Sequence, residues 1–278
     1  MTGYKFTKTE REKITDFFFG SLLESFPLAA SASLTQIFYK HLFEVALILE
    51  LRTSEKPKLL DVGGGMGVNA IILSYLFGYE CTVIDRYFEF LPEHNREVGD
   101  KFAVSERLRH FGVDVCEQNF TEVGFPYSSE SFHVITCFDV IEHFNFSPKK
   151  LISEMAAMLK TSGNLLIGTP NQVHLYNRIK ALLGKNTWED FEYFYSAKHF
   201  YGHIREFTPG EFETVMSREP SLKFNKLFFS NYPIESKKTF LNAKFGHLPA
   251  TAIRRLVMMV NYVVPNLNYY MVAVSTKS

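Results

Sequence analysis

The period of the hydrophobic pattern changes along the chain. Between about residues 8 and 51, and most clearly in SLTQIFYKHLFEVALILEL, apolar residues recur three or four positions apart, which predicts helix. From about residue 57 to 170, short apolar runs indicate strands at KPKLLDV, ECTVID, LRHFGVDV, SFHVITCFD and GNLLIGTP. Helical patterns separate some of them, as in GMGVNAIILSYLF and in the stretch from Ser147 to Lys160. This alternation predicts a parallel sheet with helices on both faces.

The pattern loosens after Pro170. Residues 171–208 are rich in aromatic side chains, His and Asn without a clear period, which is typical of a lid or a binding loop. Thr208 and Glu211 then form a capping-box pattern that starts a helix in TPGEFETVMSRE. LKFNKLFFS and YYMVAVSTK read as late strands, with the apolar, partly basic helix PATAIRRLVMMVNYVV between them.

These elements predict a domain organisation. We expect an N-terminal helical extension over residues 1–50 and one α/β domain over residues 51–278. Within that domain, residues 171–208 would form the lid and residues 236–268 a helical insertion before the last strand. The 278 residues, 46% of them hydrophobic, suffice for one large core with a helical addition.

Charge and cysteine content narrow the function classes. Lys+Arg and Asp+Glu both number 30, so a nucleic-acid partner, which needs a basic face, is disfavoured. The three cysteines have no metal-ligand spacing and favour a reduced, cytoplasmic setting over a disulfide framework. No apolar run approaches the roughly 18–20 residues of a membrane span, and acidic residues near the N-terminus argue against an export signal.

The stretch LLDVGGGMGVNA places glycines where the first predicted strand turns into its helix, which is where ligands bind in open parallel sheets. The spacing fits neither the G-x-G-x-x-G dinucleotide motif nor the G-x-x-x-x-G-K-[ST] phosphate loop. Asp61 leads the glycines, Asp85 closes the next strand, and Asp114 is expected to close the third. Carboxylates around a pocket suit a ligand with ribose hydroxyls, an amine and a positive centre, which favours S-adenosylmethionine (SAM).

Six stretches together resemble the class I SAM-dependent methyltransferases: LLDVGGGMG, VIDR, FGVDV, FPYSSESFHVITCFDVIEHF, LKTSGNLLIGTPN and HIREFTPGEF. They cover about residues 57–230, and the nearest branch is the one associated with bacterial polysaccharide and glycolipid biosynthesis. The resemblance implies a Rossmann-like, seven-stranded, mostly parallel sheet. It also implies a set of cofactor-binding residues: Asp61, Gly63, Gly65, Gly67, Asp85, Arg86, Asp114, Val115 and Asp139.

By that similarity, Gly63, Gly65 and Gly67 would let the backbone pass the methionine part of SAM, with Asp61 behind them. Asp85 would hold the ribose, and Asp114 with Val115 would contact the adenine edge. Asp139 replaces the glutamate that relatives often carry at the pocket floor.

Three residues are candidates for catalysis: Glu142, His143 and His203. Glu142 and His143 share a helical face with Asp139, and His203 comes from the predicted lid. In one hypothesis His143 or His203 is a general base that deprotonates an acceptor hydroxyl. In a second, Glu142, His143 and His203 bind a divalent metal, and in a third His143 only packs under its helix. We assign no metal at this stage.

The expected activity is O-methylation of a sugar or of a polysaccharide or glycolipid intermediate. The alternatives are O-methylation of a quinone or other small aromatic, and a SAM-binding protein without transferase activity. The lid aromatics Trp188, Tyr193, Tyr195 and Tyr201 either stack on the acceptor or form the core of the lid. Residues 249–264 either contact a membrane peripherally or pack against protein, and the sequence leaves the oligomeric state open.

Overall fold

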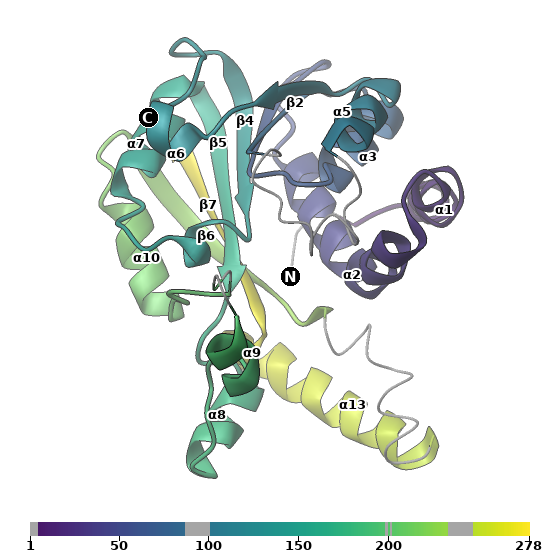
Figure 1. The fold of residues 1–278 in the computed structure, drawn as a ribbon, viewed down its shortest axis with the longest axis vertical. Coiled ribbons are helices and arrows are strands. Elements are labelled where there is room, and N and C mark those ends of the chain that lie inside the picture. Colours follow the sequence, from purple (N-terminus) through teal and green to yellow (C-terminus); the bar gives the residue numbers. More distant parts are fainter. Residues whose placement is uncertain (1–4, 87–100, 198–199, 201, 233–246) are drawn as a thin grey trace.

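The computed structural model of the chain describes residues 5–86, 101–197, 200, 202–232 and 247–278. Its centre is a seven-stranded sheet with the order β3-β2-β1-β4-β5-β7-β6 (Figure 1). The strands are β1 (Lys58–Val62), β2 (Glu80–Asp85), β3 (Asp114–Glu117), β4 (Phe132–Phe138), β5 (Leu159–Pro170), β6 (Leu222–Ser230) and β7 (Tyr270–Lys277).

The first five strands run parallel, and only β7 is antiparallel to its neighbours β5 and β6. The carboxyl ends of β1 to β5 therefore meet at one edge of the sheet, where open α/β sheets bind ligands. This topology confirms the predicted Rossmann-like, mostly parallel sheet.

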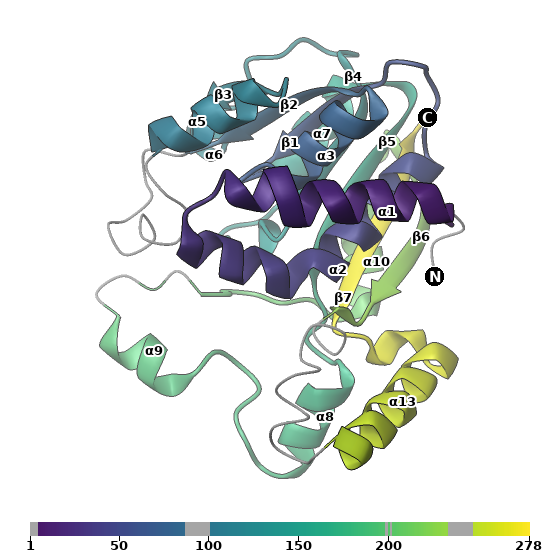
Figure 2. The same ribbon diagram turned by 90° about the vertical axis from the view of Figure 1, so that its right-hand side faces the viewer.

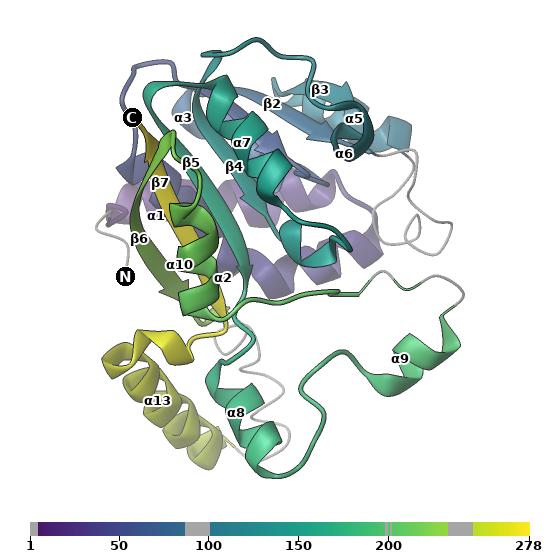
Figure 3. The same ribbon diagram turned by 90° about the vertical axis from the view of Figure 1, so that its left-hand side faces the viewer.

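Helices cover both faces of the sheet (Figures 2 and 3). One face carries α1 (Lys8–Phe17), the short π-helix η1 (Phe18–Leu22), α2 (Leu28–Glu50), α3 (Val68–Phe77) and α5 (Lys101–His110). The other carries α6 (Phe120–Val123), α7 (Lys149–Met158) and α10 (Pro209–Ser217). Three more helices are α8 (Leu175–Leu182), α9 (Phe191–Ser196) and α13 (His247–Val263), and short 3-10 turns are η3 (Ile141–His143) and η4 (Pro265–Leu267).

The alternation of side chains along each strand divides the core in two. Leu59 packs with the cluster under α2 and α3, whereas the next residue, Leu60, packs with the cluster under α7 and α10. Leu165 and Leu166 of β5 divide in the same way. Because both faces are covered, each of these strands is apolar on both sides, as its sequence indicated.

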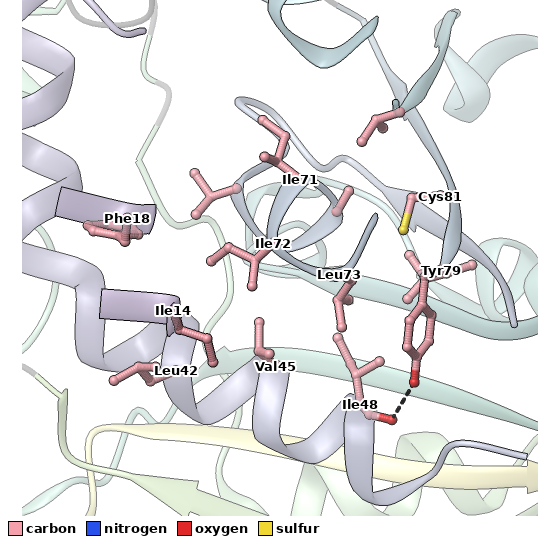
Figure 4. Packing of buried hydrophobic residues seen from close by; sticks show 14 of the residues in the cluster. Ile14, Phe18, Leu42, Val45, Ile48, Ile71, Ile72, Leu73, Tyr79 and Cys81 are labelled. Carbon is pink, nitrogen blue, oxygen red and sulfur yellow. Dashed lines mark hydrogen bonds between the residues drawn. The ribbon is translucent and has the colours of Figure 1, made fainter. Parts of the chain in front are cut away.

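The N-terminal helices belong to the first of these cores. Figure 4 shows Ile14 of α1 beside Leu42 and Val45 of α2, and the Phe18 ring lies 4.6 Å from that of Phe38 in the same helix α2. The Tyr79 hydroxyl also donates a 3.4 Å hydrogen bond to the Ile48 carbonyl oxygen. The predicted extension over residues 1–50 therefore contributes a full layer of the core.

A buried polar network fixes α2 on the sheet. Glu44 is buried, and its carboxylate accepts hydrogen bonds from the Asn69 side chain of α3 at 2.7 Å and from the Tyr270 hydroxyl of β7 at 2.7 Å. Lys40, one turn earlier, lies 3.5 Å from the same carboxylate. Burial opposes ionisation of Glu44, but Lys40 and His41 outweigh it and lower its pKa to about 2.

Several sequence-based boundaries are wrong. The helix predicted over 8–51 is interrupted before Leu28, because Pro27 cannot continue a helix and is instead the N-cap residue of α2. LRHFGVDV is not one strand: α5 ends at His110, Gly112 takes a φ of 75°, and β3 begins at Asp114. The helix predicted to reach Lys160 ends at Met158, and β5 begins at Leu159.

The segment predicted as an irregular lid contains two helices, α8 and α9. Asp190 accepts hydrogen bonds from the Glu192 and Tyr193 amides and so caps the start of α9. The predicted capping box of α10 is confirmed, since Thr208 and Glu211 exchange these bonds. None of the described helices is long and apolar enough to span a membrane.

Replacing Glu44 with Ala should destabilise the fold strongly. The change leaves Lys40 buried without one of its two carboxylate partners and leaves the Tyr270 hydroxyl without an acceptor. We expect a loss of about 3–5 kcal/mol of unfolding free energy in urea. Gln36→Ala, on the exposed side of the same helix, should change it by less than about 0.5 kcal/mol. Equal losses for both variants would contradict this role of Glu44.

Candidate active site

The glycine loop connects β1 to α3 at the ligand edge of the sheet. Gly63, Gly65 and Gly67 take φ values of 67°, 53° and 67°, a region that other residues adopt only with strain. A Cβ atom on Gly63 would lie 2.5 Å from Val140, whereas one on Gly65 would meet no atom within 4 Å. Gly63 is thus required by packing, and Gly65 presents bare backbone to open space.

Asp85, the last residue of β2, lies directly beside this loop. Its carboxylate accepts hydrogen bonds from the backbone N–H of Gly65 at 2.8 Å and of Arg86 at 2.6 Å. Burial raises the pKa of Asp85, while these two hydrogen bonds oppose the shift. A carboxylate has about four acceptor positions, so Asp85 can still accept from ligand hydroxyls.

Asp61 lies behind the loop. The Thr136 hydroxyl donates to its carboxylate at 2.7 Å, and a Cβ atom on Gly64 would lie 2.6 Å from its other oxygen. The side chain is almost fully buried, and this burial raises the pKa of Asp61 to about 7. Asp61 therefore supports the loop from the core side, as the resemblance implied.

Asp114 and Val115 do not lie where the sequence placed them. Asp114 is the first residue of β3 and pairs with Thr82. It therefore lies three residues before the carboxyl end of β3, away from Asp85. The partner of Asp85 is Glu117, which accepts a hydrogen bond from Ser105 at 2.8 Å. The prediction that Asp114 closes the third strand is wrong because Gly112 ends a helix there, and a glycine after a helical run is a recognisable stop signal.

Asp139 directly follows β4, and its side chain joins the end of that strand to α2. It adopts a φ of 53°, and its side chain remains partly exposed while forming an ion pair with Lys40. Burial alone would lower the pKa of Lys40, but Asp139 and Glu44 outweigh it and raise the pKa. Sequence reasoning missed Lys40, because nothing in a helical pattern tells which turn reaches the sheet edge.

The three catalytic candidates come together. One ligand atom each of Glu142, His143 and His203 lies within 4.8 Å of the others, although His203 is 60 positions further along the chain. The His143 and His203 rings meet edge to face at 5.0 Å between centroids. The Glu142 carbonyl oxygen also accepts from the Ile204 and Arg205 amides at 2.7 and 3.0 Å. Backbone bonds therefore attach the lid segment beside η3.

Glu142 and His203 differ in their environments. Glu142 is fully buried, accepts from the Thr169 hydroxyl at 3.2 Å, and has its pKa raised to about 8 by burial and by Asp139. Burial would lower the pKa of His203, but a 2.6 Å hydrogen bond with Glu206 and nearby carboxylates raise it. His203 is the more accessible of the two and can exchange a proton with a ligand.

Arg205 and Glu206 do not pair with each other in the segment after α9. Arg205 bonds Glu211 at 2.8 Å instead, and Glu206 is taken by His203. The sequence did not identify Glu206 as the partner of His203, because side-chain direction in an irregular segment cannot be read from residue spacing.

A cavity of about 370 Å³ opens beside His203 within the lid segment. Its walls are mostly aromatic, and the lining residues are Asn186, Trp188, Glu189, Phe191, Phe194, Phe200, His203 and Ile204. Tyr193 leans on Phe200 and Tyr195 stacks on Phe191, both at about 5.5 Å, so these tyrosines support the walls from outside. Tyr201, the fourth aromatic singled out in the sequence, lies outside the described residues.

Comparison with known families matches residues 36–219, about two thirds of the chain, to a family described as a methyltransferase domain. The chain belongs to this methyltransferase family. The matched region begins inside α2, so Lys40 and Glu44 are part of the family domain.

Individual relatives of this methyltransferase are distant. It is 25% identical over 217 residues to the uncharacterized methyltransferase YcgJ of Bacillus subtilis, covering 77% of this chain and 76% of that protein. Among solved structures it is similar to a SAM-dependent, possible histamine N-methyltransferase of Thermotoga maritima, with 14% identity, a TM-score of 0.52 and coverage of 96% and 99%. A geranyl diphosphate methyltransferase gives 12% identity, a TM-score of 0.51 and coverage of 85% and 77%. At these identities the structures support the fold alone.

The residues of the methyltransferase site fit SAM. Gly65 leaves room for a ligand against the backbone, and Asp85 offers a carboxylate at the end of β2. Asp139 adds a second carboxylate, which is paired with Lys40 and remains partly exposed. This combination suits a ribose and a cationic centre better than it suits a polyphosphate.

The buried carboxyl of Asp61 should make stability depend on pH. A folded-state pKa of about 7, raised above the usual value of 3.8, means that its stabilising contribution is full below pH 4 and is lost as the pH rises through 7. Asp61→Asn should therefore reduce the decline in unfolding free energy between pH 5 and pH 8 by up to about 3 kcal/mol. Urea unfolding of both proteins at the two pH values measures this. An unchanged decline in the variant would contradict the raised pKa.

Proposed function

We propose that this methyltransferase transfers a methyl group from SAM to a hydroxyl group of a small-molecule acceptor. The observation that carries the proposal is the position of two features on one sheet edge. The open backbone of Gly65 with Asp85 lies at the ends of β1 and β2, and the Glu142–His143–His203 cluster follows β4. Cofactor and acceptor would therefore meet above the central strands.

The cofactor side is assigned to the residues around the loop. Asp85 accepts from the ribose hydroxyls, the loop backbone at Gly65 lies along the methionine part, and Asp139 faces the positive end. Bound SAM supplies a methyl group that is already activated on a sulfonium. The ion pair with Lys40 holds the carboxylate of Asp139 in one place.

The protein must then position the acceptor oxygen and remove its proton. An in-line displacement needs an approach of about 3–3.5 Å with good alignment, which the lid walls enforce. His203 is the favoured base, because its Nδ1 is held by Glu206 and this leaves the other ring nitrogen for the acceptor. Glu142 is buried and accepts from the Thr169 hydroxyl at 3.2 Å, so it fastens the turn that carries His143 to β5.

The acceptor class rests on the sequence and the lid cavity together. The resemblance favours a sugar or a polysaccharide or glycolipid intermediate as the acceptor. The aromatic walls around Trp188, Phe194 and Phe200 support a flat ring, which keeps a quinone or other small aromatic as the second candidate. Both classes present a hydroxyl, so the residues proposed for proton removal are the same.

One similar solved structure is named for a reaction other than methyl transfer. The [4+2]-cyclase SpnF is similar to this chain, with 15% identity, a TM-score of 0.50 and coverage of 84% and 80%. Because that protein is named for a cyclisation, the fold by itself does not require methyl transfer. A protein that binds SAM but transfers no methyl group is therefore the alternative.

Replacing His203 with Ala tests the proposed base. Transfer of labelled methyl from SAM to an accepted sugar or catechol should fall about 10²–10⁴-fold in kcat, while SAM affinity stays within about twofold. His110→Ala, an exposed histidine at the end of α5, is the matched control and should keep full activity. Equal activity of the His203 variant and the control would contradict the assignment.

Treatment with a chelator distinguishes a His203 base from a metal bound at the Glu142–His143–His203 cluster. Among the described residues, Glu142, His143 and His203 are also spaced to hold a divalent ion, with a nitrogen and oxygen donor set that suits transition metals. If His203 acts as the base without a metal, the rate should be unchanged after treatment with EDTA. A loss that added Zn²⁺ or Mn²⁺ restores would assign the cluster to a metal instead.

Acceptor binding can be followed separately from catalysis, because Trp188 is the only tryptophan of the chain and lines the lid cavity. We expect an acceptor ring in this cavity to quench or shift its fluorescence, in the presence of S-adenosylhomocysteine and without turnover. Phe194→Ala should weaken that response about tenfold, whereas Tyr75→Ala, an exposed aromatic on α3, should not. A methylated acceptor that leaves Trp188 fluorescence unchanged would contradict the use of this cavity.

A further inference from the structure

The end of the molecule beyond the ligand edge of the sheet is formed by α8 and α13 (Figure 1). The start of α8 lies next to the end of α13. The side chain of Asn171, just before α8, donates to the carbonyl oxygens of Asn266 and Asn268, which follow α13, both at 2.8 Å. The rings of His174 and Tyr269 also meet, with 4.9 Å between their centroids. These contacts join the bases of the two helices.

Large apolar side chains on these helices are exposed instead of buried. Among the described residues they are Tyr176, Ile179, Leu182 and Leu183 of the α8 segment, and Leu256, Met258, Met259, Tyr262, Val263 and Val264 of the α13 segment. Leu182 is 87% exposed. We call this set the apolar face. Large apolar side chains exposed in this number on two helices that are joined at their bases indicate an interaction surface, since single exposed apolar residues are normal.

The two stretches of sequence that contain the apolar face carry Lys and Arg but no Asp or Glu. Residues 171–188 contain Arg178, Lys180 and Lys185 and no Asp or Glu. Residues 236–268 likewise contain no Asp or Glu, and their basic residues are Lys237, Lys238, Lys244, Arg254 and Arg255. All 30 acidic residues of this neutral chain therefore lie elsewhere in the sequence. Such a separation of charge is not needed for folding, and it indicates an anionic partner.

We propose that the apolar face lies on an anionic lipid membrane, with the basic residues of α8 and α13 at the level of the head groups. Leu, Met and Val side chains would enter the boundary with the acyl chains, and Tyr176 and Tyr262 suit the interface between them and water. A second copy of the chain fits less well. In a two-fold dimer each basic cluster would face its own copy, and the like charges would repel.

The apolar face lies close in the chain to the cavity that is proposed to bind the acceptor. Helix α8 belongs to the same segment after β5 as the cavity around Trp188 and His203. A membrane beneath α8 and α13 would therefore lie next to the lid. The proposal does not depend on methyl transfer, since a protein of any activity can bind lipid through this face.

Vesicle co-sedimentation of the full chain tests the proposal. We expect binding to vesicles of phosphatidylcholine with phosphatidylglycerol and at least tenfold weaker binding to phosphatidylcholine alone. Raising the salt from about 0.1 M to about 1 M shortens the Debye length from about 10 Å to about 3 Å and should release most of the protein. Equal binding to both vesicle types, or binding to neither, would overturn the proposal.

Variants locate the surface. The double variant Leu182→Glu with Met259→Glu should no longer sediment with vesicles. The double variant Lys180→Gln with Arg255→Gln should bind vesicles at least tenfold more weakly, because each lost charge lowers the affinity about fivefold. Val123→Glu, an equally exposed apolar residue on α6, is the matched control and should bind as the unchanged chain does. Retained urea unfolding and S-adenosylhomocysteine binding in every variant would show that the fold is intact.

Analytical ultracentrifugation completes the test. The protein without lipid should sediment as a monomer of about 32.1 kDa at micromolar concentration. A dimer that Leu182→Glu with Met259→Glu dissociates would assign the apolar face to a second copy and overturn the membrane proposal. Unchanged vesicle binding of that double variant would also overturn it. Loss of methyl transfer with normal vesicle binding would count against the proposed function alone.

Discussion

The carboxylate of Glu44 joins three parts of the chain that are far apart in sequence. It lies on α2, accepts from Asn69 at the start of α3 and from Tyr270 at the start of β7, and contacts Lys40. A buried charge is costly unless it is paired and hydrogen bonded, so any arrangement that separates these segments loses several partners at once. This fixes α2 against the edge of the sheet where the glycine loop lies.

The site inherits its geometry from that constraint. Because Glu44 holds the turn that carries Lys40, the ammonium group reaches Asp139 at the end of β4, next to the loop. On the other side, Asp85 bonds the Gly65 amide and Asp61 supports Gly64 from the core. The acceptor side is held by weaker means, chiefly the backbone bonds from Ile204 and Arg205 to Glu142.

Much of this could be predicted from the sequence, because alternating strands and helices leave few topologies and a glycine loop after the first strand marks the ligand edge. The same reasoning placed Glu142, His143 and His203 near one another, which the geometry confirms, although their roles stay predictions. It failed at Asp114, because a helix end was read as a strand and the strand was shifted by several residues. Lys40 and the Glu44 network were missed, since long-range polar contacts leave no local pattern.

The central claim is that the glycine loop and Asp85 form a SAM site, and calorimetric titration with S-adenosylhomocysteine tests it most directly. The account predicts micromolar binding to the unchanged protein. Asp85→Ala should weaken this binding at least a hundredfold, because the ribose hydroxyls and the Gly65 amide lose their shared acceptor, about 3 kcal/mol in all. Glu122→Ala, an exposed acidic residue on α6, should bind normally. Absence of binding to protein that is shown to be folded, or undiminished binding to the Asp85 variant, would contradict the account.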